Sequence, residues 1–324
     1  MFYMNKKINS LDYVRVVAVF MILVCHYYLF SDLNNGIGRY LAGVGNMLFF
    51  LVSALLYGIK YRVDCQIMDN RHFIINRIVK LGASVWPYLI VLIVLYLVFG
   101  IRFSWIFAGL NFMFLGYLGI LPGNGHLWFL TVLMVCYLEL ILLQKLKANN
   151  RYVPWVILVA SMLLVLVGER IGIPSGAFLT FGLFGFIFLR SEWFMQKSKS
   201  MKFWMAIVIV ALNVVCFFVE YNGLFEKSRS LHFLLSGLCG ITMLSLLLRY
   251  IQDKSNKVVS FLCGISFEIY IVHHTLCAGP FIRITQWPYG HVLNFCIIVA
   301  LSIGLALLLK FIAKGLLSIL KAKA

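Results

Sequence analysis

Arg15 and His26 are the first residues whose types and spacing suggest chemistry. They are eleven residues apart, and the ten residues between them are apolar or small. On an α-helix this spacing is about three turns, so both side chains would share one face, about 16 Å apart along the axis. Ionisable groups inside an apolar run are costly and mark functional sites. In the structural alternative, Arg15 reaches toward lipid headgroups and His26 hydrogen-bonds a neighbouring helix. The shared face favours a function for the pair.

A second polar stripe lies near the end of the chain. Ser266, Tyr270 and His273 recur at i, i+4 and i+7, which places them on one helix face. In the topology predicted below, His273 lies about as deep in the membrane as His26. The two histidines would either flank one reaction centre or make two unrelated hydrogen bonds between helices. Glu268 falls on a different face, where we expect it to be a structural hydrogen-bond partner, with an acid or base role as the alternative.

Charged residues elsewhere offer two further candidates. Arg71, Arg77 and Lys80 lead directly into an apolar run. They would form either a phosphate clamp or an ordinary cluster of cytosolic positive charge, and charge alone favours neither interpretation. Glu139 is a carboxylate deep in another apolar run, and its partner would be an arginine or a histidine.

Motifs of metal-dependent and hydrolytic enzymes do not occur in the sequence. It has no HExxH, GxSxG or P-loop pattern, and of its seven histidines only His273 and His274 are close together. No two of the eight cysteines lie within three residues of each other, so neither a redox CxxC pair nor a zinc knuckle is present. We therefore expect no metal in the site.

The elements that must position these residues belong to a membrane protein. The 324 residues are 63% hydrophobic and 12% charged, with a mean hydropathy of +0.96. A soluble domain has about 45–50% apolar and roughly 25% charged residues. Because apolar runs recur along the whole chain, these values exclude a soluble fold, a disordered chain and a single-span receptor. They predict an all-α, polytopic membrane bundle.

The net charge of +17 does not indicate nucleic-acid binding. The basic residues lie in short loops between apolar runs, where they set the orientation of a membrane protein. No basic face on a soluble domain remains for a nucleic acid. We expect membrane lipid as a partner and no nucleic acid.

Ten apolar runs are long enough to cross about 30 Å of hydrocarbon, which takes roughly 20 residues. They are approximately 10–30, 37–59, 73–99, 126–146, 152–169, 172–189, 203–221, 231–250, 258–280 and 292–318. An eleventh run, 104–120, is shorter and contains Gly109, Asn111, Gly116 and Gly119. Whether this run crosses the membrane decides the orientation of everything after it.

The distribution of positive charge predicts that 104–120 does not cross. If it does not, and the N-terminus is cytosolic, 21 basic residues lie on the cytosolic side and 6 outside; if it crosses, the split is 11 against 16. The positive-inside rule favours the first solution. We therefore predict about ten transmembrane helices, both termini in the cytosol, and 104–120 as a re-entrant or interfacial segment. Irregular backbone at membrane depth must be buried in protein or line a cavity, so the region 104–128 is a candidate part of the active site.

The chain is expected to form a single integral-membrane domain, 1–324, with no appended soluble domain. Its N-terminal run imitates a signal peptide, because two lysines precede an apolar stretch. That stretch contains Asp12 and Arg15, and no A-x-A-like site follows it. We interpret the run as an uncleaved first span.

Five segments of the sequence resemble motifs of the integral-membrane acyltransferase family 3, which O-acylates bacterial surface glycans. The segment LDYVRVVAVFMILVCH is similar to the family's arginine-x10-histidine signature through Arg15 and His26. GNMLFFLVSALLYG in the second span places Ser53 at the serine of a further motif. RHFIINRIVKLGASVWPY resembles the basic entry to the third span.

The last two segments complete the resemblance. GHLWFLTVLMVCYLEL contains His126 and Trp128 in the family's "hLWFL" pattern, and SFEIYIVHH resembles its S-x-x-x-Y-x-x-H stretch. The five motifs follow the family order over residues 11–274. The sequence departs from the pattern at Ala54, where the family has glycine, and at Pro87, to which the expected proline is displaced.

The resemblance implies acetyl-CoA as a cytosolic acyl donor and a glycan or lipid-linked glycan hydroxyl on the outer side as the acceptor. Arginine matches phosphate well, which suits coenzyme A. The residues implied in donor binding are Arg15, Ser53, Arg71, Arg77 and Lys80. The residues implied in catalysis are His26 as general base, with His273 or Tyr270 within reach. The residues implied in acceptor binding are His126, Trp128 and Glu139, with Trp128 stacking on a sugar ring.

The resemblance also implies a location in the bacterial cytoplasmic (inner) membrane. It assigns no oligomeric state. A transporter or flippase for a lipid-linked glycan is the main alternative, because it would also need polar residues at the midplane. Such proteins commonly have internal repeats and broken helices at corresponding positions, and no repeat is evident here. A membrane sensor or scaffold is a third alternative, but it would explain neither the Arg15–His26 face nor the basic cluster.

Overall fold

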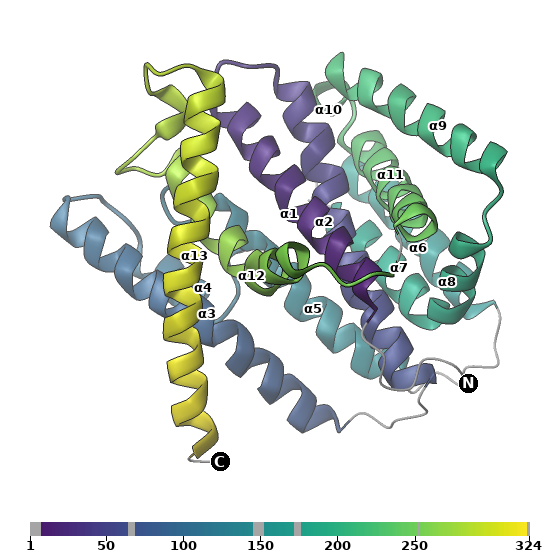
Figure 1. Ribbon diagram of the computed structural model, residues 1–324, viewed down its shortest axis with the longest axis horizontal. Coiled ribbons are helices and arrows are strands. Elements are labelled where there is room, and N and C mark those ends of the chain that lie inside the picture. The colour runs from purple at the N-terminus through teal and green to yellow at the C-terminus, as the bar shows by residue number, and fades with distance from the viewer. Residues whose placement is uncertain (1–7, 64–68, 145–151, 172–175, 252, 323–324) are drawn as a thin grey trace. The chain divides into compact units, whose positions relative to one another are not determined.

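The computed structural model of the protein describes residues 8–63, 69–144, 152–171, 176–251 and 253–322 (Figure 1). Within these ranges the regular structure is helical and contains no strand, which confirms the all-α fold class. The helices are α1 (Asn9–Phe30), α2 (Asn35–Gly58), α3 (Asn70–Val98), α4 (Trp105–Phe112), α5 (Trp128–Leu143), α6 (Val153–Arg170), α7 (Gly176–Leu189), α8 (Ser191–Lys199), α9 (Phe203–Tyr221), α10 (Leu224–Lys227), α11 (Arg229–Tyr250), α12 (Lys257–Ala278) and α13 (His291–Ala322). Short π or 3₁₀ segments are η1 (Ile59–Val63), η2 (Gly125–Leu127) and η3 (Ile284–Gln286).

In the described part of the chain, nine helical segments are long and apolar enough to cross a membrane. They coincide with nine of the ten predicted spans and confirm a polytopic bundle. The remaining prediction, 172–189, begins at four residues that lie outside the described part. Its helix α7 has 14 residues, about 21 Å, and α8 follows it at a bend of 83°. The α7–α8 pair is a tenth span only if the two helices together form one broken element.

Segment 104–120 contains only the eight residues of α4 in helical form. Eight residues extend about 12 Å, which is too short to cross the hydrocarbon core. The buried amide of Asn111 donates to the carbonyl of Gly119 at 2.8 Å and so closes the turn after α4. The indole of Trp86 donates to the carbonyl of Phe112 at 3.0 Å and attaches the segment to α3. The segment is thus compact and bonded to its neighbours, in agreement with the prediction that it does not cross as a helix.

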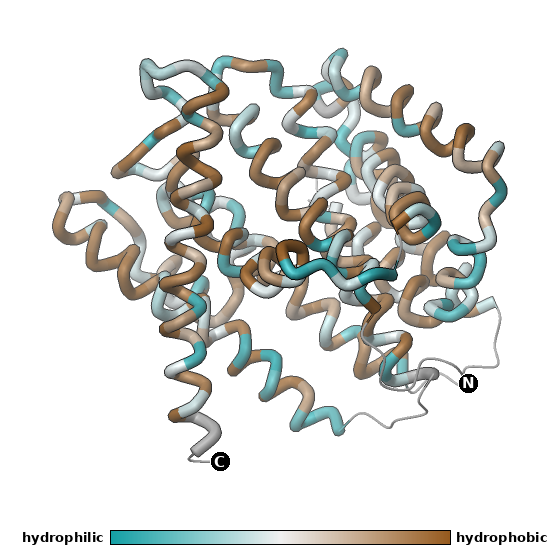
Figure 2. The backbone as a smooth tube through the Cα atoms, viewed as in Figure 1, coloured by the Kyte–Doolittle hydropathy of each residue, from teal (hydrophilic) through white to brown (hydrophobic). Residues whose placement is uncertain are grey.

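Hydrophobic residues predominate along the helices (Figure 2), and polar residues begin several of them. A side-chain oxygen accepts a first-turn backbone N–H in α2, α3, α4 and α11. These caps satisfy donors that have no partner inside the helix. The capping residues are Asn34, Asp69, Ser104 and Ser228.

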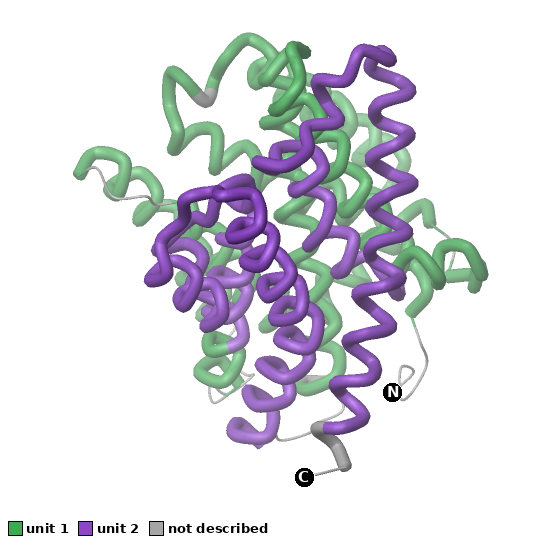
Figure 3. Tube along the Cα trace, turned by 90° about the vertical axis from the view of Figure 1, so that its left-hand side faces the viewer, with its two compact units in different colours: residues 1–68, 138–263 green, residues 69–137, 264–324 purple. Residues whose placement is uncertain are grey.

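The chain divides into two compact units, each built from two stretches of sequence (Figure 3). The first unit contains residues 1–68 and 138–263, and the second contains residues 69–137 and 264–324. Two of the three boundaries fall within α5 and α12, and the third lies between residues 68 and 69. The expectation of one integral-membrane domain stays a prediction.

In the first unit, α2 packs against α1, α7, α9 and α11. Glycines of α2 allow these close approaches. A Cβ atom at Gly45 would lie 3.0 Å from a side-chain carbon of Ile22, and one at Gly43 would overlap the side chain of Ser236. Small residues at such positions let membrane helices approach closely without a side chain between them.

In the second unit, α3 packs against α4 and α13, and polar groups join α3, α12 and α13. The hydroxyl of Ser84 donates to Glu268 Oε1 at 2.9 Å, and the ammonium of Lys310 donates to the same oxygen at 3.1 Å. Glu268 is 2% exposed. The expectation that Glu268 is a structural hydrogen-bond partner is therefore confirmed.

Candidate active site

The second unit holds a buried cluster of three histidines and one tyrosine, which we name the histidine cluster: His126, Tyr270, His273 and His274. His126 comes from η2, immediately before α5, and the other three come from α12. All four are at most 4% exposed. The rings of His126 and His274 are stacked, with centroids 4.5 Å apart and an interplanar angle of 17°. The rings of His273 and Tyr270 lie 5.5 Å and 5.4 Å from His126.

Backbone carbonyls fix one ring nitrogen of each histidine. His273 Nδ1 lies 2.8 Å from the carbonyl of Tyr270, and His274 Nδ1 lies 2.7 Å from that of Gly123. His126 Nε2 lies 3.0 Å from the carbonyl of Ile271. Because a carbonyl oxygen only accepts, each of these nitrogens must carry the hydrogen. In a neutral ring the other nitrogen then has the lone pair, namely Nε2 of His273 and His274 and Nδ1 of His126.

The loop before α5 is bonded to α12 at several points. The phenol of Tyr270 donates to the backbone carbonyl of His126 at 2.6 Å. Together with the bonds that His126 and His274 make, this gives three hydrogen bonds between residues 123–126 and one face of α12. The loop is therefore held in register with the helix that carries His273.

Helix α3 supports the same loop from a third direction. The phenol of Tyr88 donates to Asn124 Oδ1 and contacts the hydroxyl of Thr275 at 2.6 Å. Asn124 Nδ2 in turn donates to the phenol oxygen of Tyr96 at 3.0 Å, and Tyr96 donates to the carbonyl of Pro122. This chain of hydrogen bonds satisfies polar groups that would be costly to bury unpaired.

The structure brings together three of the predicted site residues, Tyr270, His273 and His126. The first two follow from their helical spacing, but the sequence did not connect His126 with them. Trp128 lies two residues after His126 at the start of α5 and is half-buried, with its ring 6.4 Å from that of Phe129. The roles predicted for these residues stay predictions.

The basic candidates of the second unit lie in the first turns of α3. Arg71 and Lys80 are exposed, whereas Arg77 is half-buried. The guanidinium of Arg77 lies over the rings of Phe73 and Tyr137, 5.3 Å and 6.0 Å from their centroids. Such cation–π contacts leave the edges of the guanidinium for hydrogen bonding. The choice between a phosphate clamp and ordinary positive charge stays open.

In the first unit, α1 carries both members of the arginine–histidine signature. Arg15 and His26 are half-buried, and the His26 ring stacks against that of Phe30 with centroids 6.1 Å apart. The thiol of Cys263 donates to Asp12 Oδ1 at 3.4 Å, and the Arg15 guanidinium also faces this thiol. Arg15 thus lies in a small polar group at the start of α1.

The other two candidate residues of the first unit are Ser53 and Glu139. Ser53 donates its hydroxyl to the carbonyl of Phe49, one turn earlier in α2, at 3.0 Å. Glu139 lies against Gly185 of α7, where a Cβ atom would be 2.5 Å from the carboxylate. Glu139 Oε2 is buried and has no hydrogen-bond partner among the described residues. Neither an arginine nor a histidine is paired with this oxygen there.

Several residues of the cluster and its support were missed by sequence reasoning. They are Tyr88, Tyr96, Gly123, Asn124, His274 and Thr275. Gly123 and Asn124 fall within the candidate region 104–128, and His274 had a signal because it forms the one close histidine pair with His273. The others contact one another across large sequence separations, such as 187 residues between Tyr88 and Thr275. Periodicity within one helix carries no information about such contacts.

Among the described residues, no group of three or more histidine, cysteine or acidic side chains could hold a metal ion. The three clustered histidines are arranged as stacked and edge-on rings rather than converging on one point. In the neutral state each ring has one nitrogen with a lone pair, as a proton acceptor requires.

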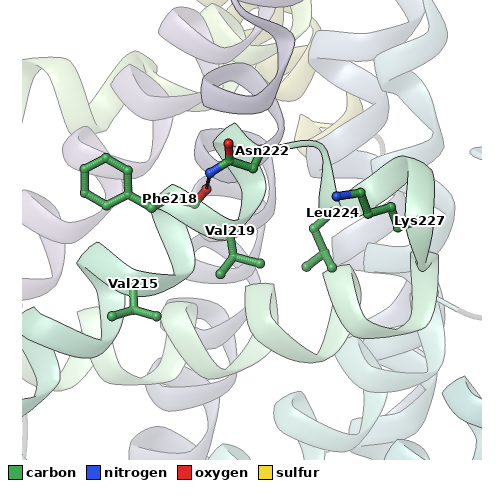
Figure 4. A pocket seen from close by; sticks show the side chains of 6 residues that line it. All are labelled: Val215, Phe218, Val219, Asn222, Leu224 and Lys227. Atoms are coloured by element: carbon green, nitrogen blue, oxygen red, sulfur yellow. Dashed lines mark hydrogen bonds between the residues drawn. The ribbon is translucent and has the colours of Figure 1, made fainter.

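A groove of about 370 Å³ lies on α9 and α10 in the first unit (Figure 4). Its lining residues are Val215, Phe218, Val219, Asn222, Leu224 and Lys227. The Asn222 amide donates to the carbonyl of Phe218 at 2.7 Å, so it is used within α9. The lining contains no histidine, thiol or carboxylate and none of the predicted site residues. The groove therefore offers no general base for acyl transfer.

The fold defines a polytopic helical membrane protein with a buried histidine cluster. The sequence model of acyltransferase family 3, described as an acyltransferase domain, matches residues 8–311, and the chain belongs to this family. The protein is thus a membrane acyltransferase. No curated protein and no solved structure matches the chain.

Proposed function

We propose that the protein transfers an acetyl group from acetyl-CoA to a hydroxyl of a glycan or lipid-linked glycan. The family match over residues 8–311 supports acyl transfer, and the motifs with Arg15 and His26 support this donor and acceptor. The family match is the observation that carries the proposal. Removal of a hydroxyl proton requires a base, and we assign this role to the half-buried imidazole of His26 on α1.

The reaction needs one proton acceptor and one carbonyl electrophile. The acceptor hydroxyl gives its proton to a histidine as its oxygen attacks the carbonyl carbon of the thioester. The new C–O bond forms, the C–S bond breaks, and coenzyme A leaves as a thiolate that takes up a proton. His26 is the proposed general base, with His273 or Tyr270 assisting. General-base catalysis of this kind contributes about 10²–10⁴ in rate.

Donor and acceptor are assigned to different sets of residues. The proposed donor-binding residues are Arg15, Ser53, Arg71, Arg77 and Lys80. The proposed acceptor-binding residues are His126, Trp128 and Glu139. Guanidinium groups pair with phosphate through two parallel hydrogen bonds, which suits the phosphates of coenzyme A. The half-buried indole of Trp128, two residues from the histidine cluster, suits stacking on a sugar ring.

We place the protein in the cytoplasmic membrane of a bacterium, with both termini in the cytosol. Acetyl-CoA would then enter from the cytosol and the glycan from the opposite side. The excess of basic residues in the predicted cytosolic loops supports this orientation, 21 against 6.

The proposed donor can be tested without knowing the acceptor. Acetyl-CoA that binds the folded protein should raise its thermal midpoint as the concentration passes the dissociation constant. We expect saturable stabilisation of the detergent-purified protein, and its loss in Arg15→Ala. Arg283→Ala is the matched control, because Arg283 is exposed and lies in a predicted outer loop. Absence of stabilisation in monodisperse protein would contradict the donor and favour a transporter or flippase.

Transfer itself is measured with radiolabelled acetyl-CoA and envelope glycan from the host that expresses the protein. In His26→Ala we expect acetyl-CoA stabilisation to persist while acetylation of the glycan falls by about 10²–10⁴. A folded His26→Ala protein with full transfer activity would exclude His26 as the general base.

A further inference from the structure

His274 is a buried histidine that the proposed mechanism leaves without a role. It is 4% exposed, and its ring stacks on that of His126 at 4.5 Å. Its neighbour His273 points to the carbonyls of its own helix instead. His274 is therefore the member of the pair that joins α12 to the loop carrying His126.

The hydrogen bond from His274 to the carbonyl of Gly123 depends on the backbone conformation of that loop. Gly123 has a φ of +67°, the left-handed region that favours glycine. A Cβ atom there would lie 2.7 Å from Pro280 Cδ and 2.8 Å from Gly279 Cα. Only glycine fits this conformation and space, and it brings its carbonyl 2.7 Å from His274 Nδ1.

His126 is held at three points, two on its ring and one on its backbone carbonyl. Its Nε2–H donates to Ile271, its backbone carbonyl accepts from Tyr270, and its face lies on His274. The bond to Ile271 commits Nε2 as the donor, so Nδ1 has the lone pair of the neutral ring. The ring of His274 lies nearly parallel to that of His126, at an interplanar angle of 17°.

We propose that His274 is a positioning residue for acyl transfer, which fixes His126 and the loop of residues 121–127 against α12. This inference rests on the proposed function for its effect on turnover. The position of His126 does not depend on that function and is measured separately. Misplacement of a group in a site by about 1 Å can cost about 10²-fold in rate.

Three substitutions separate the hydrogen bond from the stacking. His274→Asn keeps an N–H near the position of Nδ1, whereas His274→Gln moves it one carbon further out. His274→Phe keeps a flat ring on His126 but has no donor for the Gly123 carbonyl. His291→Phe is the control, because His291 is an exposed histidine at the start of α13.

The first measurement is amide hydrogen exchange of peptides that cover residues 119–127. We expect exchange in this segment to become faster in His274→Phe and His274→Gln, and to stay near the parent rate in His274→Asn and in the control. Peptides of α9 should not change in any variant. Equal exchange in all five proteins would overturn the proposal whether or not the enzyme transfers acetyl groups.

The second measurement is the rate of coenzyme A release from acetyl-CoA with the envelope glycan fraction as the probe. We expect kcat to fall at least about tenfold in His274→Phe and to recover to within about threefold in His274→Asn, with KM for acetyl-CoA unchanged. If His274→Phe does not fold, His274→Gln against His274→Asn makes the same comparison. A kcat as low in His274→Asn as in His274→Gln would overturn the proposal. If the parent protein releases no coenzyme A while the exchange results hold, the proposed function fails and the positioning role stands.

Discussion

At the scale of single residues, backbone carbonyls decide which nitrogen of each clustered histidine can act as a base. The carbonyls of Tyr270, Gly123 and Ile271 each take one ring N–H. In the neutral ring the second nitrogen of each histidine has the lone pair. A histidine whose tautomer is set by a second partner is better defined as a base than one free to exchange. The tautomer of each ring thus depends on the positions of backbone carbonyls, which residue types in the sequence do not indicate.

The hydroxyl of Tyr88 makes hydrogen bonds whose contribution to stability can be measured. It contacts Asn124 and Thr275 through two hydrogen bonds inside the second unit. Tyr88→Phe leaves both partners without this phenol, and unsatisfied buried groups cost about 1–3 kcal/mol. We expect the free energy of unfolding in detergent micelles to fall by about 1–3 kcal/mol.

Tyr289→Phe is the control for this experiment, because Tyr289 is 60% exposed. It should unfold like the parent protein. If Tyr88→Phe is as stable as Tyr289→Phe, the contacts of the Tyr88 hydroxyl contribute nothing net to the fold.

At the scale of elements, the apolar length of each run was enough to predict nine spans, but it could not locate the break after Leu189. The 3.6-residue period also placed Tyr270 and His273 on one face of a helix. The same period does not predict which helices pack against each other. The approach of Tyr88 to Thr275, or of His126 to α12, depends on packing between segments far apart in the chain. Asn111 and the nearby glycines did indicate that 104–120 is irregular, because they disfavour a continuous helix.

The ion pair between α12 and α13 is a contact between elements that can be tested directly. Glu268 is 2% exposed, and its partner Lys310 is 36% exposed at the side chain. Lys310→Met removes the cation and leaves the carboxylate with Ser84 alone. We expect a loss of about 1–3 kcal/mol in the free energy of unfolding. This is less than for a fully buried pair, because water already reaches the ammonium.

Two further variants isolate this pair. Lys314→Met removes an exposed lysine one turn later in the same helix and should change stability little. Glu268→Gln combined with Lys310→Met removes the uncompensated charge but keeps an acceptor for Ser84, so it should recover most of the loss. If the double variant is no more stable than Lys310→Met alone, the unpaired charge of Glu268 is not the cause of the loss in stability.

At the scale of the whole molecule, charge decides orientation where helix length cannot. Segment 104–120 lies between residues 1–103 and 121–324. If it crossed the membrane, every later loop would lie on the opposite side. The 21 basic residues on one side against 6 on the other favour a segment that stays on the outer side. The eight-residue α4 is consistent with this arrangement, because it is too short to cross.

Membrane-impermeant maleimide applied to intact cells tests this orientation. Cysteines introduced at the exposed positions Arg102 and Lys227, before and well after the segment, should both be labelled from outside. A cysteine at the exposed Lys254 should be labelled only after the membrane is permeabilised. The parent protein corrects for native thiols, of which Cys296 is exposed. If 104–120 crosses, Arg102 and Lys227 lie on opposite sides, and only one of the two would react in intact cells. That result would also place the two termini on opposite sides of the membrane, against the prediction that both are cytosolic.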